Sequence, residues 1–102
     1  MIILKDILHK VAIKAISGSE EVAVQKIEFD SRKIEANDIF VAIRGSVSDG
    51  HDYIQKVIEL GAAVVVCDTF PEQFEDGVTY IQVVDTNEAL AFMGANYFGN
   101  PS

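Results

Sequence analysis

Two short apolar runs constrain the fold of this chain more than any other feature of its sequence. Ile39 to Ile43 and Ala63 to Cys67 are uninterrupted apolar runs rich in β-branched residues, which is typical of strands covered on both faces of a sheet. The segment between them places apolar side chains at helical spacing, namely Tyr53, Ile54, Val57, Ile58 and Leu60. Gly61 follows where the end of a helix favours a residue with positive φ. A strand, a helix and a strand in this order predict parallel pairing.

The flanking segments extend this unit into a small domain. Apolar residues at i, i+3, i+4 and i+7 predict a short helix over residues 4–11, and partial alternation predicts a strand with one exposed face over 22–29. A further strand is predicted over 78–84, followed by a helix that begins at an Asp85–Glu88 capping box. The length of 102 residues suits a single domain. We therefore predict one small α/β domain over residues 1–102, with a mixed sheet flanked by helices.

The charge balance limits the ligands that such a domain could bind. Sixteen acidic residues outnumber eight basic ones, giving a formal charge of −8, and the largest basic cluster is Arg32-Lys33. Binding to nucleic acid is therefore not expected. A membrane span is not expected either, because no segment approaches the roughly 20 apolar residues that one requires. An anionic ligand would need local cations or backbone N–H groups against this overall field, which draws attention to Arg32 and Arg44.

The cysteine and the two histidines give little indication of catalysis. Cys67 is the only cysteine, so an internal disulfide is impossible, and we expect a buried, unreactive thiol in a reducing, cytosolic protein. His9 is expected to be a solvated or partly buried side chain. His51, near Asp49 and Asp52, is expected to order its loop by hydrogen bonding, with a metal or acid–base role as the alternative. No phosphate loop for ATP occurs in the sequence.

One stretch stands out from this background. It reads Phe29-Asp30-Ser31-Arg32-Lys33, then Asn37-Asp38-Ile39-Phe40-Val41-Ala42-Ile43-Arg44-Gly45, and then Asp49-Gly50-His51-Asp52-Tyr53. Each piece alone is consistent with an ordinary turn or strand end. Their order and spacing, with Gly61-Ala62 after the helix, resemble the N-terminal domain of the Mur ligases, most closely of the MurE branch. The resemblance runs from about Ile27 to Ser102. Asn37 replaces a common glycine, and asparagine tolerates left-handed backbone.

The resemblance implies a substrate-binding part of a larger enzyme. In the MurE branch this domain holds the UDP moiety of UDP-N-acetylmuramoyl-L-alanyl-D-glutamate, while a central domain binds ATP and magnesium and a C-terminal domain brings the incoming amino acid. Both further domains lie outside this chain, so the isolated domain is expected to be inactive and to contain no catalytic residue, cofactor or metal. The full enzyme would be a cytoplasmic UDP-N-acetylmuramoyl-tripeptide synthetase of peptidoglycan synthesis, adding diaminopimelate or lysine. The alternatives are the N-terminal domain of MurF and a stand-alone ligand- or protein-interaction module of the same fold.

Carried over by position, the resemblance assigns nucleotide contacts to two segments. The residues are Phe29 and Ser31 in the first segment and Ser46, Val47 and Ser48 in the second. An aromatic ring can pack on uracil, and hydroxyl and loop N–H groups can bond its edge or the diphosphate without net charge. Arg32 is a further candidate because a guanidinium matches phosphate oxygens. It could equally pair with a nearby carboxylate and brace the loop.

Overall fold

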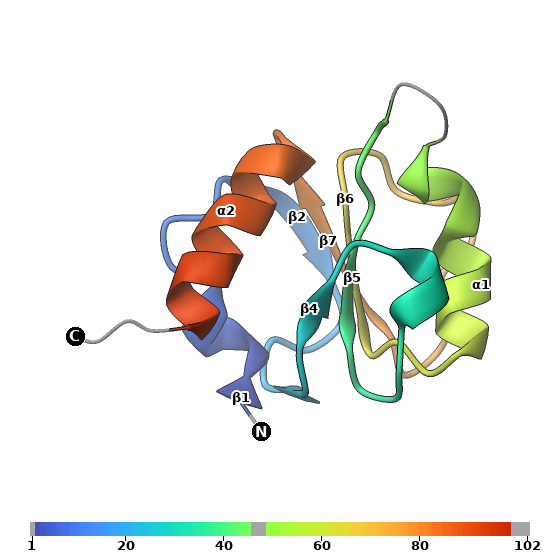
Figure 1. The fold of residues 1–102 in the computed structure, drawn as a ribbon, viewed down its shortest axis with the longest axis horizontal. Helices are drawn as coiled ribbons and strands as arrows, with labels where there is room; N and C mark the ends of the chain where they lie inside the picture. Colours follow the sequence, from blue (N-terminus) through green and yellow to red (C-terminus); the bar gives the residue numbers. More distant parts are fainter. Residues whose placement is uncertain (1, 46–48, 99–102) are drawn as a thin grey trace.

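The computed structural model describes residues 2–45 and 49–98, which fold around a five-stranded sheet (Figure 1). Its strands lie in the order β2 (Ile13–Ser17), β7 (Thr79–Val83), β6 (Val64–Cys67), β5 (Ile39–Val41) and β4 (Ile27–Glu28). The last four run parallel, and β2 pairs antiparallel with β7 at one edge. A small second sheet pairs β1 (Ile2–Ile3) with β3 (Ala23–Val24). The prediction of a mixed sheet in a small α/β domain is confirmed.

Helices cover both faces of the main sheet (Figure 1). On one face lie α2 (Thr86–Tyr97) and the 3-10 turn η1 (Leu4–Ile7). On the other lie α1 (Ile54–Glu59) and two 3-10 turns, η2 (Ser31–Lys33) and η3 (Gly50–Tyr53). No helix among the described residues is long and apolar enough to cross a membrane.

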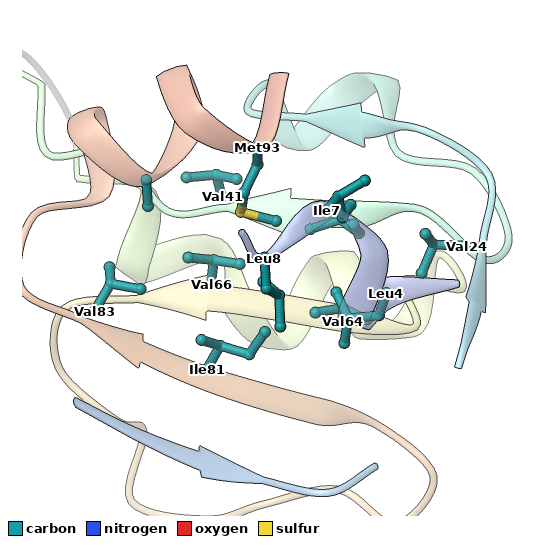
Figure 2. Packing of buried hydrophobic residues seen from close by; sticks show 12 residues of the cluster. Leu4, Ile7, Leu8, Val24, Val41, Val64, Val66, Ile81, Val83 and Met93 are labelled. Carbon is teal, nitrogen blue, oxygen red and sulfur yellow. The ribbon is translucent and has the colours of Figure 1, made fainter. Parts of the chain in front are cut away.

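Alternate residues of the central strands fill two separate cores. Toward α2 the sheet contributes Ile39, Val41, Val64, Val66, Ile81 and Val83, and toward α1 it contributes Phe40, Val65, Cys67 and Tyr80. Met93 of α2 and Leu4 and Ile7 of η1 close the first core (Figure 2). Because every position in β5 and β6 is buried on one face or the other, these strands read as continuous apolar runs in the sequence.

The N-terminal part differs from the prediction. The expected helix over residues 4–11 is only the turn η1, and Lys10 takes a left-handed φ of 70°, which a right-handed helix does not include. The Asn96 amide of α2 donates to the carbonyl oxygens of Ile7 and His9, at 3.0 and 2.8 Å. Residues 13–17, unassigned from the sequence, form β2, and the predicted strand over 22–29 is divided between β3 and β4. These short strands are selected by tertiary pairing, which local pattern does not reveal.

The N-cap of α2 and two left-handed backbone positions are confirmed. The Asp85 carboxylate caps α2 by accepting from the N–H groups of Asn87 and Glu88, at 2.9 and 3.2 Å. Gly61 has a φ of 109°, and a Cβ there would lie 2.9 Å from the Cα of Ala36. Asn37, which stands in place of the family's glycine, has a φ of 69°. Asparagine therefore satisfies the backbone requirement at this position.

Candidate functional site

A cleft of about 540 Å³ opens beyond the carboxyl ends of β4 and β5, where these strands approach η3 and α1. It is lined by Phe29, Asp30, Ser31, Arg32, Phe40, Ile43, Gly45, Gly50, Tyr53 and Lys56. Ligands of open α/β sheets commonly bind outside the carboxyl ends of the strands. The position of the cleft therefore fits a ligand site.

The cleft collects the first of the two segments predicted from the sequence. Phe29, Ser31 and Arg32 all line it. Ser46, Val47 and Ser48 lie outside the described residues, but Gly45, which precedes them, and Gly50, just beyond Asp49, both line the cleft. The fold thus brings the turn after β4 to the base of the 46–48 loop.

The turn after β4 is held by two carboxylates. Glu28 accepts from the backbone N–H groups of Phe29 and Asp30, both at 3.1 Å. Asp30 in turn accepts from the N–H of Arg32 at 2.9 Å and caps η2. This bonding fixes the backbone around Ser31 and leaves the Phe29 ring 59% exposed at the cleft. An aromatic ring held in that way is available to pack against a planar ligand.

Arg32 forms the carboxylate pair that was one of its two expected roles. Its Nε and Nη2 donate to the two carboxylate oxygens of Asp30 at 3.1 and 3.0 Å. The hydrogen bond from the Arg32 side chain is the main reason why the pKa of Asp30 is lowered to about 2, so the pair stays ionised at neutral pH. The Arg32 side chain is nevertheless 82% exposed and lines the cleft, so its remaining N–H groups face solvent.

Arg44 clamps together the segments that flank residues 46–48. Its Nη1 donates to Asp49 at 2.5 Å, and its Nε and Nη2 donate to Asp68 at 2.9 and 2.7 Å. Arg44 and Asp49 also form an isolated antiparallel bridge. Hydrogen bonding to Asp68 raises the pKa of Arg44, and the charge of Arg44 is matched by these two carboxylates. Arg44 therefore holds Asp49 and Asp68 together and does not line the cleft.

His51 completes this clamp, as the sequence predicted. Its Nδ1 lies 2.7 Å from Asp49 Oδ1, and its Nε2 accepts from the backbone N–H of Asp68 at 3.1 Å. These contacts join His51 to both Asp49 and the backbone of Asp68 and so order the segment around it. Within residues 2–45 and 49–98, no group of three His, Cys, Asp or Glu side chains is arranged to hold a metal ion.

The site residues assigned from the sequence did not include Tyr53 and Lys56. Tyr53 ends η3 and Lys56 lies three residues later on α1, and both line the cleft. Their spacing of i, i+3 places both on one helical face, and this was the only available signal. Gly50 is also needed, because a Cβ there would lie 2.7 Å from the backbone nitrogen of Ile43.

Comparison with known proteins agrees with this architecture. Residues 23–98 match the family model described as Mur ligase family, catalytic domain. The chain belongs to the Mur ligase family. Among its relatives is the UDP-N-acetylmuramoyl-L-alanyl-D-glutamate–2,6-diaminopimelate ligase of Cytophaga hutchinsonii, 44% identical over 100 residues that cover 97% of this chain and 21% of the relative. The corresponding ligase of Clostridium tetani is 41% identical over 103 residues, covering 96% of this chain and 21% of the relative.

Solved structures of Mur ligases share the fold. MurF from Thermotoga maritima, in complex with ADP, superposes with a TM-score of 0.66 and 25% identity over 78% of this chain and 18% of that protein. MurF from Acinetobacter baumannii superposes with a TM-score of 0.62 and 29% identity over 72% of this chain and 15% of that protein. The chain spans about a fifth of the length of the curated relatives it matches. The predicted family resemblance is confirmed.

Proposed function

We propose that this chain is the N-terminal domain of a MurE-type ligase and that its cleft holds the UDP moiety of UDP-N-acetylmuramoyl-L-alanyl-D-glutamate. One observation carries the proposal: the cleft joins Phe29 and Ser31 to Gly45 and Gly50 at the base of the 46–48 loop. These are the two segments to which the family resemblance assigns nucleotide contacts. The names of the related diaminopimelate ligases, 41–44% identical for the two described above, support MurE over MurF.

The chemistry of the cleft suits a uridine nucleotide. The exposed Phe29 ring provides a face for uracil, and the Ser31 hydroxyl provides a donor and an acceptor beside it. Ser46, Val47 and Ser48 would add hydroxyl and backbone N–H groups. Binding in this chain would orient the precursor in the cytoplasm, while ATP, magnesium and the third amino acid would bind to parts of the enzyme outside it.

Removal of the Ser31 hydroxyl tests the proposal. Ser31→Ala should weaken UDP binding by about 0.5–1.5 kcal/mol, more if the partner is a charged phosphate oxygen. Ser19→Ala is the matched control, because Ser19 does not line the cleft and its hydroxyl bonds only locally, to the N–H of Glu21 at 3.0 Å. Calorimetric titration with UDP measures both. Equal affinities for the two variants would contradict a role for Ser31 in the site.

The competing proposal is a stand-alone binding module that shares the fold. A gene that continues past Ser102 into a phosphate loop of the type Gly-Thr-Asn-Gly-Lys-Thr would support the ligase. A gene whose reading frame ends near Ser102 would contradict it.

A further inference from the structure

A positive charge near the cleft would favour a bound diphosphate, because the chain as a whole carries −8. The global field of such a protein repels an anion unless local cations or backbone N–H groups offset it. Two cations, Arg32 and Lys56, line the cleft. Only a cation whose charge is not already matched by a carboxylate can offset the negative field.

The charge of Arg32 is already matched. Its guanidinium makes two hydrogen bonds to the Asp30 carboxylate, which itself lines the cleft. The Asp30–Arg32 pair therefore contributes no net charge to the site. Arg44, the other arginine near the 46–48 loop, is bound between Asp49 and Asp68 and does not line the cleft.

Lys56 differs from both arginines. Within the described part of the chain, no carboxylate lies within ion-pair distance of its ammonium group, even though Asp52 and Glu59 are one helical turn away on either side. It lies on α1, three residues after Tyr53, and it lines the cleft together with Phe29 and Ser31 of the turn after β4. A lysine provides a compact charge with three donors on a flexible stem, which suits a phosphate group.

We propose that Lys56 is the cation that binds the diphosphate in this cleft, while Phe29 and Ser31 contact the uridine. This inference rests on the proposed function and adds to it the residue that distinguishes a nucleotide from a nucleoside. It predicts that Lys56 contributes to the affinity for UDP but not for uridine.

The test compares three ligands on wild-type and variant chains. Lys56→Gln keeps the length and helix propensity of the side chain but removes its charge, and Lys56→Arg restores the charge. Lys14→Gln is the matched control, because it removes the same charge from β2, at the edge of the sheet opposite β4. Each chain is titrated with uridine, UDP and inorganic pyrophosphate, and affinities are measured by NMR shifts at low and at physiological salt.

We expect Lys56→Gln to weaken UDP and pyrophosphate binding by about tenfold at low salt. This is the loss of affinity expected when one hydrogen bond to a charged group is removed. Uridine affinity should not change, Lys14→Gln should change every affinity by less than about twofold, and Lys56→Arg should recover most of the UDP affinity. The preference of the wild type for UDP over uridine should shrink as salt rises, and that of Lys56→Gln should not.

The possible failures are distinguishable. If UDP binds and Lys56→Gln behaves as Lys14→Gln does, the role of Lys56 is overturned and the nucleotide site stands. If uridine does not bind but pyrophosphate binding depends on Lys56, the cation site stands and the uridine part of the proposed function fails. If the wild type binds neither UDP nor pyrophosphate at millimolar concentration, both proposals are overturned.

Discussion

Replacing Gly50 by alanine tests how the cleft is built. A Cβ at this position would lie 2.7 Å from the backbone nitrogen of Ile43, 3.0 Å from the Cα of Ala42 and 3.1 Å from the carbonyl oxygen of Ile43. All three are backbone atoms of the segment that leaves β5, so none can rotate away as the end of a side chain could. The Gly50 N–H also donates to Ile43 at 2.8 Å, which holds the two segments at this separation. The added methyl group must therefore displace backbone on one side of the cleft.

The expected cost is the cost of overpacking. Extra methyl groups in a well-packed site typically cost about 1–3 kcal/mol, and the backbone contacts place Gly50→Ala toward the upper end of that range. Gly94→Ala is the matched control, because Gly94 lies within α2 and a Cβ there would meet no heavy atom within 4 Å. Alanine in an open helix interior gains roughly 0.5–1 kcal/mol over glycine. The same chemical change should thus have opposite signs at the two positions.

Urea unfolding followed by circular dichroism measures both free energies of unfolding. The midpoint should fall for Gly50→Ala and rise for Gly94→Ala, with similar slopes for the two chains. Gly50→Ala should also weaken UDP binding, because the displaced backbone lines the cleft. Neutral surface substitutions change the free energy of unfolding by up to about 0.5 kcal/mol. A change no larger than this for Gly50→Ala would refute the packing argument.

Three further predictions concern Cys67, the cap of α2 and catalysis. Burial raises the pKa of Cys67 to about 12 from its ordinary 9.0, so native chain should react with a thiol reagent far more slowly than unfolded chain. Since the folded state favours the protonated thiol, the stability of the fold should be intact below pH 9 and should fall as the pH rises above it, by roughly 1 kcal/mol per pH unit. A flat stability profile above pH 9, with labelling as fast as in denaturant, would show an exposed thiol. Asp85→Ala should lower the free energy of unfolding in urea by about 1 kcal/mol. A change of less than about 0.3 kcal/mol would show that the cap does not stabilise α2. The 102-residue chain should release no phosphate above blank with ATP, precursor and diaminopimelate, and measurable release would place an ATP site within it.

The central part of the fold could be predicted because its signals are local and strong. β5 and β6 are buried on both faces and so read as apolar runs, and Gly61 and Asp85 mark helix ends through their own backbone and side-chain chemistry. The N-terminal part could not be predicted in the same way. β2 pairs with the distant strand β7, and Asn96 of α2 bonds the segment at and after the end of η1, so both features depend on contacts that the local pattern does not reveal.

The site was predictable to a similar extent. Phe29, Ser31 and Arg32 are consecutive parts of a family motif, and the structure places all three on one cleft. Lys56 belongs to no such motif and reaches the cleft only because α1 packs beside the turn after β4. The pairing of Arg32 with Asp30 was one of two open alternatives, because sequence spacing does not fix side-chain direction.

The central claim, that the cleft binds the UDP end of the precursor, is tested most directly by NMR titration of this chain with UDP. The proposal predicts weak binding, because few contacts must offset the entropy of association. Amide shifts should be confined to the Phe29–Ser31 turn, the 46–48 loop and the cleft residues Tyr53 and Lys56. The absence of shifts at millimolar UDP, or shifts centred on His9 or on the Asp85 end of α2, would contradict it.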